Sequence, residues 1–304
     1  MVCAMNETKR QVLPSSLAPK GLWVVATPIG NLDDLSPRAK LALQSADAIL
    51  CEDTRRTAGL LSALGLKTRL ERMDAFASES RIDSFVARMV EGESFAYVTD
   101  AGTPAVSDPG ASLVRRAREA GVTITPIPGP SAVIALLSVS GLEKTAFVFR
   151  GFFPRKQAER KAELELTLST SVADVFIWFE SPRRIADALS EIAGFFEDRP
   201  EKTSLFAGKE LTKIHESFFW GTAREVADQV RDEIEREGER GEWCFLLSLE
   251  GRPKEESSDW VKALHCLLDA GISASEAARQ VSQHFGTGKK EVYEKALVAI
   301  GKKR

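Results

Sequence analysis

Hydrophobic and polar positions alternate in blocks along the chain. From Gly21 onward, short runs of apolar and β-branched residues are separated by segments with helical periodicity. The runs GLWVVAT, DAILCED, SFAYVTD and VTITPIP are typical of strands, and SPRAKLALQSA is typical of a helix. Ser36 and Pro37 favour the start of that helix, because serine caps a helix and proline's missing N–H costs nothing there. This alternation predicts a parallel sheet covered by helices, in an α/β domain over residues 21–142.

The pattern restarts after Gly141. The runs TAFVFRGFF, DVFIWFES, TSLFAGKELT and EWCFLLSLEG predict strands, and helices are expected over Gln157–Leu168 and along RRIADALSEIAGFF. We therefore expect a second α/β domain over residues 143–251. Trp23 and Trp178 lie within apolar runs and are expected in the cores of the two domains.

The two ends of the chain differ from these domains. Residues 1–20 predict a loose tail, and residues 252–304 predict a linker with a small helical appendage. Ser273 and Glu276 have the spacing of a capping box, and residues 286–288 separate two helical stretches. The appendage therefore resembles a helix-turn-helix.

Composition and charge narrow the class of protein. The net charge of −3 argues against indiscriminate nucleic-acid binding, so any RNA contact is expected from local basic clusters. No apolar run approaches the roughly 20 residues that span a bilayer, which predicts a cytoplasmic protein without a membrane partner. The four cysteines have no partners at metal-ligand spacing, which predicts reduced thiols and no metal site: Cys3, Cys51, Cys244 and Cys266.

Three loops follow predicted strands of the first domain. They read TPIGNLDDL, DAGTPAVSDPG and GPSA, and the carboxyl ends of parallel strands are where α/β sheets bind ligands. A tight turn would explain Asp108-Pro109-Gly110 alone, but it explains the whole segment 100–110 poorly. A ligand site at this edge is therefore expected.

Charged residues near strand ends are candidates for chemistry. In CEDTRR, Glu52 and Asp53 beside Arg55 could neutralise one another and lie partly buried, or could form a solvated helix start. In GKELTKIHES, Lys209, Glu210 and Lys213 could supply a base or a substrate contact. His215, in the same segment, is expected at the surface.

One segment interleaves cations with aromatic residues. RGFFPRKQAERK, residues 150–161, predicts either a surface that grips phosphates and stacks on bases or a solvated helix face. Two familiar nucleotide motifs are excluded. GTGKK at 286–290 lacks the glycine and hydroxyl residue that a P-loop needs, having Gln283 and Lys290 there, and GxGxxG is absent.

Taken together, several segments closely resemble the ribosomal RNA small-subunit methyltransferase I family, within the tetrapyrrole-methylase superfamily. These segments, in order between Gly21 and Gly251, are ATPIGNLDDLSPRA, CEDTRR, VTDAGTPAVSDPG, PIPGPSAVIALLSVSG, GFFPRK, FESPRR, KELTKIHE and RGEW. The resemblance implies a class III methyltransferase, with two α/β domains, S-adenosylmethionine in the cleft between them and a homodimeric assembly. It also implies methylation of the 2′-hydroxyl of a cytidine in the decoding region of 16S rRNA in the small ribosomal subunit.

The resemblance also assigns site residues. Those expected around S-adenosylmethionine are Pro28, Ile29, Gly30, Asp100, Ala101, Gly102, Thr103, Ser107, Asp108, Gly129, Pro130, Ser131, Ala132, Phe179, Leu211 and Thr212. Apart from the resemblance, the basic residues expected from their charge to bind RNA are Arg150, Arg155, Lys156, Arg160, Arg183, Arg184, Lys289 and Lys290. Residues 73–80, MDAFASES, depart from the His-Asn-Glu stretch common in relatives, with Glu79 keeping an acid there. RNA recognition is therefore where this chain is expected to differ.

A sulfonium methyl is already activated, so the protein mainly has to hold the acceptor oxygen in line and exclude water. A base would assist by about 10²–10⁴-fold, and the candidates are Glu52, Asp53, Asp100 and Glu210. Arg55 and Lys209 could grip neighbouring phosphates and stabilise the developing alkoxide. Two alternatives stay open: C-methylation of a tetrapyrrole, and non-catalytic nucleic-acid binding through the helical appendage.

Overall fold

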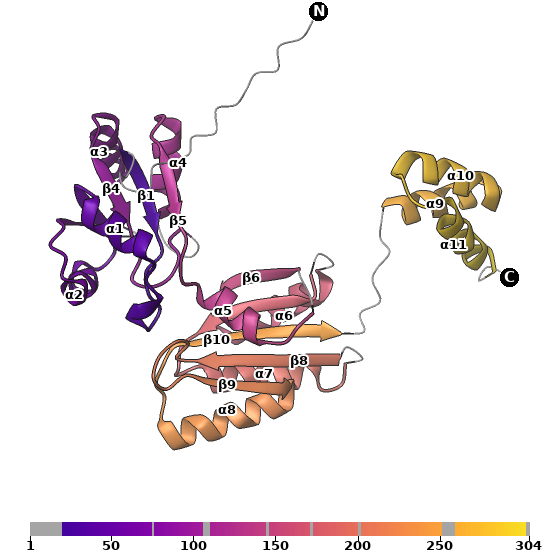
Figure 1. Cartoon of the computed structure of the whole chain (residues 1–304). Coiled ribbons are helices and arrows are strands. Elements are labelled where there is room, and N and C mark those ends of the chain that lie inside the picture. Colours follow the sequence, from indigo (N-terminus) through magenta and orange to yellow (C-terminus); the bar gives the residue numbers. More distant parts are fainter. Residues whose placement is uncertain are drawn as a thin grey trace, which may run out of the picture.

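The computed structural model describes residues 20–74, 76–105, 110–143, 146–170, 173–199, 202–250 and 259–301. Two α/β lobes and a group of C-terminal helices follow one another along the chain (Figure 1). The α/β fold expected from the sequence is confirmed. Among the described residues, no helix is long and apolar enough to span a membrane.

The first lobe is built on a parallel sheet. Its described strands lie in the order β3-β2-β4-β1-β5, and every pairing between them is parallel. The strands are β1 (Gly21–Val25), β2 (Ala48–Cys51), β3 (Leu70–Arg72), β4 (Ser94–Tyr97) and β5 (Ile124–Ile127). The helices are η1 (Leu32–Asp34), α1 (Pro37–Ser45), α2 (Thr54–Leu64), α3 (Glu79–Val90), α4 (Gly110–Glu119) and α5 (Ala132–Val139). The predicted start of α1 is confirmed, because Ser36 Oγ accepts a hydrogen bond from Ala39 N.

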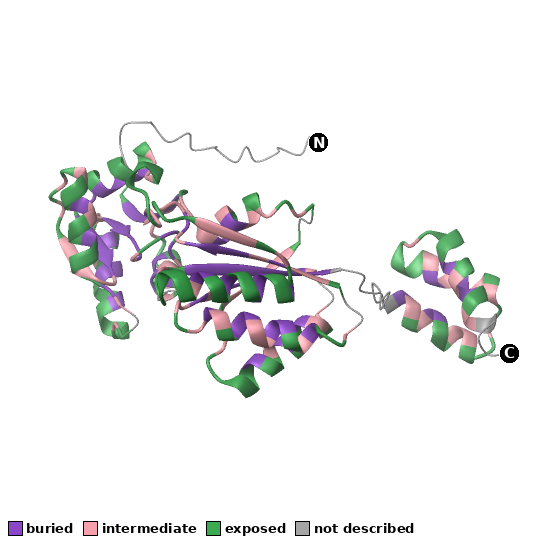
Figure 2. Ribbon diagram, turned by 90° about the horizontal axis from the view of Figure 1, so that it is seen from below, coloured by how far each residue is buried: buried purple, intermediate pink, exposed green. Residues whose placement is uncertain are grey.

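Both faces of this sheet are buried (Figure 2). Side chains alternate across a strand, so Leu22 joins the core beneath α3 and α4, and its neighbour Trp23 joins the core beneath α1 and α2. Trp23 is buried, as the sequence predicts. Because both faces are covered, ligands can reach this sheet only along its edges and strand ends.

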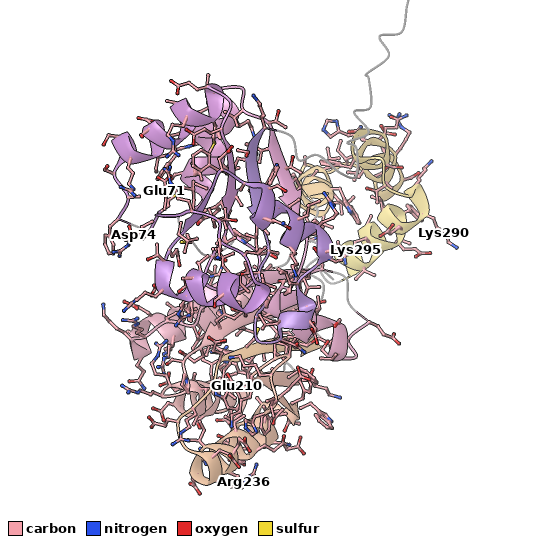
Figure 3. All side chains as sticks on the ribbon, turned by 60° about the vertical axis from the view of Figure 1, so that its left-hand side comes forward. Glu71, Asp74, Glu210, Arg236, Lys290 and Lys295 are labelled. Carbon is pink, nitrogen blue, oxygen red and sulfur yellow. The ribbon has the colours of Figure 1, made fainter. Side chains whose placement is uncertain are left out.

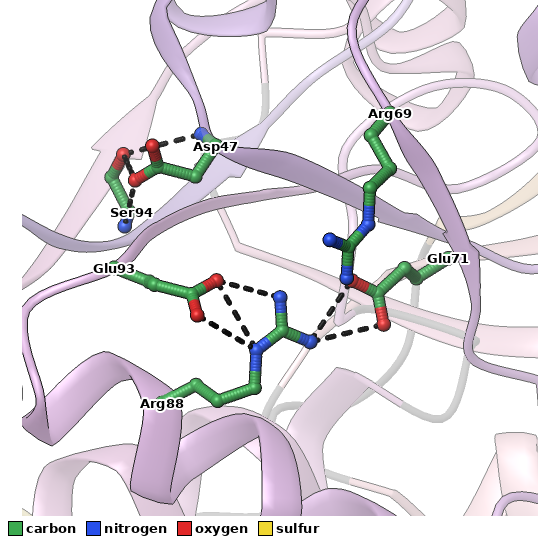
Figure 4. A network of polar contacts seen from close by, with 6 residues as sticks. All are labelled: Asp47, Arg69, Glu71, Arg88, Glu93 and Ser94. Atoms are coloured by element: carbon green, nitrogen blue, oxygen red, sulfur yellow. Dashed lines mark hydrogen bonds and ion pairs between the residues drawn. The ribbon is translucent and has the colours of Figure 1, made fainter.

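An ion-pair network closes the amino-terminal edge of the first sheet (Figure 4). Arg88 on α3 donates to both carboxylate oxygens of Glu71 at 2.9 and 3.1 Å, and its Nη2 lies 2.6 Å from Glu93 Oε2. Its guanidinium also lies 4.7 Å from the centroid of the Phe95 ring. Nearby, Asp47 Oδ2 accepts from Ser94 N and Ser94 Oγ, both at 2.7 Å. This network joins α3 to β3 and β4, at the edge opposite the strand-end loops.

Replacing Arg88 with alanine is expected to destabilise the fold by about 2 kcal/mol, because Glu71 is left partly buried without this partner. The same change at exposed Arg118, on α4, is expected to stay within about 0.5 kcal/mol. The hydrogen bond from Arg88 lowers the pKa of Glu93 from its ordinary 4.5. That part of the stabilisation is therefore complete above about pH 4.5 and disappears as the pH falls through the lowered value. Urea unfolding at pH 7 and pH 3 measures both effects, and an equal loss at the two pH values would contradict the pairing.

The second lobe contains a mixed sheet. Its described strands lie in the order β6-β7-β10-β8-β9, with β6 and β7 parallel and the other pairs antiparallel. The strands are β6 (Phe147–Phe152), β7 (Val175–Glu180), β8 (Lys202–Lys209), β9 (Ser217–Thr222) and β10 (Trp243–Glu250), and the helices are α6 (Gln157–Ser169), α7 (Ile185–Phe196) and α8 (Ala223–Glu237). Strand β9 and helix α8 were not predicted from the sequence. Trp178 is buried beneath α7 and α8, as predicted.

Helix α5 ties the two lobes together. It follows the last strand of the first lobe, but Val133 and Leu136 pack against Ile177 and Leu246 on the second sheet. Ile29, from the first loop of the first lobe, packs against the same cluster. The two lobes therefore share a hydrophobic core at the side where the strand-end loops of the first lobe lie.

The C-terminal helices form a core of their own. They are α9 (Asp259–Asp269), α10 (Ala274–Phe285) and α11 (Lys289–Gly301), and Leu264, Val281 and Val292 are buried among them. Ser273 caps α10 by accepting from Glu276 N, which confirms the predicted helix start. The helical character expected of this region is confirmed, with α9 added before the two expected helices.

Candidate functional site

The loops at the carboxyl edge of the first sheet are bonded to one another. Thr27, after β1, and Gly102, after β4, exchange two backbone hydrogen bonds at 3.0 and 3.1 Å. Thr103 Oγ1 donates to the carbonyl of Pro130, after β5, at 3.0 Å, and Thr27 Oγ1 donates to the carbonyl of Thr99 at 3.4 Å. The three loops are thus brought together as the strand order predicts.

Gly102 allows this close approach. Its φ of 81° lies in the left-handed region, and a Cβ there would lie 3.4 Å from Ile29 Cγ2 and 3.7 Å from Pro130 O. A larger side chain would therefore meet the loops after β1 and β5. Glycine adopts this left-handed conformation without strain, and it leaves the contact between the three loops free of side-chain atoms at residue 102.

The second lobe contributes a strained loop after β8. Glu210 and Thr212 both have positive φ, at 54° and 66°. Such backbone conformations cost free energy in residues with a Cβ, and they concentrate at functional sites. The Thr212 hydroxyl is buried, and no group in the described part of the chain forms a hydrogen bond with it, although a buried polar group normally has a partner.

This loop presses against the first lobe at Gly30. A Cβ on Gly30 would lie 2.3 Å from Lys213 Cγ and 3.0 Å from Leu211 O. The Lys213 ammonium is held by Glu210 Oε1 at 2.7 Å and Glu242 Oε2 at 3.0 Å. The Lys213 side chain therefore forms a strut of the second lobe that lies against Gly30 of the first. Figure 3 shows Glu210 on the second lobe, below the first.

The Glu210 carboxylate is held by two hydrogen bonds beside this strut. Its Oε1 accepts from Lys213 Nζ and, at 2.8 Å, from Glu242 N. Burial raises the pKa of the Glu210 carboxyl, but the hydrogen bonds and the charge of Lys213 outweigh burial and lower it overall. Glu210 is therefore a structural carboxylate that binds protons weakly near neutral pH.

Other groups at the lobe junction suit a small polar ligand with an aromatic part. Ser131 precedes α5 and makes no side-chain capping bond, so its hydroxyl and the first N–H groups of the helix can receive a carboxylate. Phe179, at the end of β7, lies edge-on to Phe149 and Phe152, with ring centroids 4.9 and 5.6 Å away. Ile29, Ala132, Phe179 and Leu211 belong to one apolar cluster.

The carboxylates beside β2 lie at the start of α2. Asp53 caps this helix by accepting from Arg55 N at 2.8 Å, and its own N–H donates to Asp100 Oδ1 at 3.3 Å. The side-chain hydrogen bond from Arg55 lowers the pKa of Asp53 to about 2. Arg55 is exposed and Glu52 is partly buried. Of the two interpretations of CEDTRR, the structure favours the solvated helix start.

Four basic residues expected to contact the substrate or RNA are held by acidic partners within the second lobe. Lys209 is buried on the far face of the second sheet, with Nζ 2.6 Å from Glu233 Oε1. The reason is the alternation of β8, which points Gly208 toward Leu136 and Leu211 at the junction and Lys209 away from it. This corrects the expectation that Lys209 touches the substrate.

Arg160, Arg184 and Arg150 are likewise engaged within the second lobe. Arg160 is buried, and it donates to Glu191 Oε1 and to the carbonyl of Pro154, both at 2.8 Å. Arg184 pairs with buried Glu180. Arg150 makes two hydrogen bonds of 2.7 Å to Glu163. The burial of Arg160 corrects the expectation that it grips an RNA phosphate. Arg150 and Arg184 are 29% and 23% exposed, and their contact with RNA stays a prediction.

The remaining candidates are placed as follows. Exposed basic residues are Arg155, Lys156, Arg183, Lys289 and Lys290, and His215 is exposed as favoured. The residues expected to bind S-adenosylmethionine at the strand-end loops are Pro28, Ala101, Gly129, Pro130 and Ala132. Ser107 and Asp108 lie outside the described residues. Thr27 and Thr99 were not singled out from the sequence. Lys213, a candidate for a base or a substrate contact, donates instead to Glu210 and Glu242.

Comparison with known proteins identifies the family to which this chain belongs. The family model described as Tetrapyrrole (Corrin/Porphyrin) Methylases matches residues 21–227. A relative from Xylella fastidiosa (strain Temecula1 / ATCC 700964) is 39% identical over 90% of this chain and 98% of its own, and one from Neisseria meningitidis serogroup B is 39% identical over 96% and 98%. Both are named ribosomal RNA small subunit methyltransferase I. The chain belongs to this family of methyltransferases.

Solved structures agree on the fold of these methyltransferases. The uroporphyrin-III-C-methyltransferase of Thermus thermophilus has a TM-score of 0.50 and 19% identity, covering 75% of this chain and 94% of its own. A cobalt precorrin-4 methyltransferase has a TM-score of 0.51 and 17% identity, covering 75% and 93%. The two-lobed methylase fold expected from the sequence is thereby confirmed.

Proposed function

We propose that the protein transfers the methyl group of S-adenosylmethionine to the 2′-hydroxyl of a cytidine in the decoding region of 16S rRNA. We further propose that it acts in the cytoplasm, as a homodimer, on the small ribosomal subunit. The observation that carries the proposal is the full-length similarity to relatives named for small-subunit rRNA methylation. A relative of the same name from Escherichia coli O157:H7, 35% identical over 92% of this chain and 96% of its own, adds to that support.

The lobe junction fits S-adenosylmethionine. The buried, unpartnered Thr212 hydroxyl supplies a hydrogen-bonding group that the protein itself leaves unused. Ser131 and the start of α5 suit the methionine carboxylate, and Phe179 with Leu211 suits the adenine ring. When bound there, the donor supplies an activated methyl group that needs no further activation by the protein.

The residues of the chain then have two tasks. The first is to hold the ribose oxygen in line with the bond from the donor sulfur to its methyl group and to keep water away. The loops after β1, β4 and β5, which are hydrogen-bonded to one another, provide the surface for this task. The second is to accept the hydroxyl proton. Asp53, with a pKa of about 2, and Glu210, held by two donors, are poor acceptors near neutral pH. We assign the proton to Asp100, whose Oδ2 lies 3.5 Å from Arg56 Nη1.

The test uses small subunits from a strain that lacks the gene for this chain, mixed with the purified protein and radiolabelled S-adenosylmethionine. Mapping of ribose methyl groups is expected to find one new 2′-O-methyl cytidine in the decoding region. Asp100→Asn is expected to lower kcat by roughly 10²–10⁴-fold at saturating donor, whereas Asp53→Asn should change it much less. No methyl transfer to the subunit, with an absorbance change on a porphyrinogen instead, would favour tetrapyrrole methylation.

A further inference from the structure

Three arginine–aspartate pairs line the carboxyl edge of the first sheet. Arg55 pairs with Asp53 at 3.1 Å, Arg56 with Asp100 at 3.5 Å, and Arg72 with Asp74 at 2.7 Å, measured from nitrogen to oxygen. Their aspartates follow β2, β4 and β3, which are neighbours in the sheet. The last two of these strand ends are also linked to β2 through the backbone, since Met73 N donates to Cys51 O and Val98 N to Leu50 O.

In each pair the arginine side chain is more exposed to solvent than the aspartate side chain. The arginine side chains are 90%, 64% and 68% exposed, and their aspartates are 30%, 30% and 24% exposed. The guanidinium group is therefore the more accessible charge of each pair. A phosphate that approaches from outside meets the free N–H groups of the arginines before it meets a carboxylate.

Phe76 lies beside this arginine edge. It follows β3 by four residues and is 92% exposed, although phenylalanine is among the residues most often buried. Its backbone is fixed: Phe76 N donates to Asp74 Oδ1 at 3.1 Å, and Ala77 N donates to Asp74 O at 3.0 Å. Figure 3 shows Asp74 at the outer rim of the first lobe, nearer than Glu71 to the second lobe. An aromatic ring is thus presented to solvent on an anchored turn.

We propose that Phe76 stacks on an unpaired base of the substrate RNA while Arg55, Arg56 and Arg72 contact the neighbouring phosphates. This inference rests on the proposed function and extends it to the contacts that hold the strand. Single-stranded RNA is the partner that needs both features, because splayed bases stack on aromatic rings and the backbone between them carries one charge per nucleotide. The aromatic face accepts any base, so it contributes affinity and leaves the choice of nucleotide to other contacts.

The experiment measures affinity for the same small subunits at two salt concentrations, together with affinity for S-adenosylmethionine. Phe76→Ala is expected to raise the Kd for the subunit by roughly 5- to 100-fold, because base stacking on one aromatic ring contributes that much. Phe76→Tyr should bind like the wild type, and Phe76→Leu should bind like Phe76→Ala. Arg72→Ala should weaken binding and reduce the slope of log affinity against log salt by about one. Donor affinity should stay unchanged in all four variants.

Matched controls lie at the opposite edge of the same lobe. Val90→Ala removes another exposed apolar side chain, at the end of α3, and Arg118→Ala removes an exposed cation, at the end of α4. Both should bind the subunit like the wild type. Wild-type affinity in Phe76→Ala, or equal losses in Phe76→Ala and Val90→Ala, would overturn the inference while leaving the proposed function intact. A wild-type protein that neither binds nor methylates the subunit would instead refute the proposed function.

Discussion

Replacing Gly102 with valine is expected to abolish binding of S-adenosylmethionine. Residue 102 has a φ of 81°, and a β-branched residue there is a steric outlier that costs more than about 1 kcal/mol. A Cβ would already touch Ile29 Cγ2 at 3.4 Å, so the γ carbons of valine must displace the loop after β1 or the loop after β5. Since these loops form the expected donor site, we expect the Kd measured by calorimetry to rise by at least about 100-fold, or 2.7 kcal/mol.

Gly121 is the matched control for this variant. Its φ of 76° imposes nearly the same backbone strain, but a Cβ there meets no atom within 4 Å, and it lies in the turn between α4 and β5 at the other edge of the sheet. Gly121→Val should lower the free energy of unfolding while leaving donor affinity unchanged. If both variants weakened donor binding equally, general destabilisation would explain the effect and the loops would lose their assigned role.

Replacing Gly30 with alanine is expected to disable methyl transfer by forcing the lobes apart. The added Cβ would lie 2.3 Å from Lys213 Cγ, far inside van der Waals contact, and 3.0 Å from Leu211 O. The Lys213 side chain cannot easily yield, because Glu210 and Glu242 hold its ammonium. Overpacking of this kind typically costs about 1–3 kcal/mol, and small misplacements of reacting groups lower rates by about 100-fold. Turnover on small subunits and donor calorimetry measure the outcome.

A second substitution can test the steric cause. Lys213→Ala removes the clashing Cγ, so Gly30→Ala combined with Lys213→Ala should recover part of the activity that Gly30→Ala loses. Gly59→Ala provides a neutral control, since a Cβ there meets no atom within 4 Å on α2. A double variant less active than both single variants would show that the strut itself, rather than the clash, governs the spacing of the lobes.

Local sequence determined most of the elements and the expected position of the ligand site. Ser36-Pro37 starts α1 and Ser273 caps α10, because both depend on hydrogen bonds within a few residues. The strand-end position of the loop around Gly102 followed from the alternation of strands and helices, since parallel strands place their carboxyl ends at one edge. The family resemblance rested on those same loops, and the comparisons with relatives confirmed it.

Only the tertiary structure decided which charged side chains are exposed to solvent. Lys209 lies at a strand end, a position that suits substrate contact, yet its side chain points into the core of the second lobe. This face of β8 becomes internal because α8, which follows later in the chain, covers it. Arg160 and Arg55 both lie in basic segments of the sequence. In the structure the Arg160 side chain is buried, whereas the Arg55 side chain is exposed to solvent. Local periodicity gives the direction of a side chain relative to its own strand or helix. Burial depends on elements that the chain brings from far away, and no local pattern records which they are.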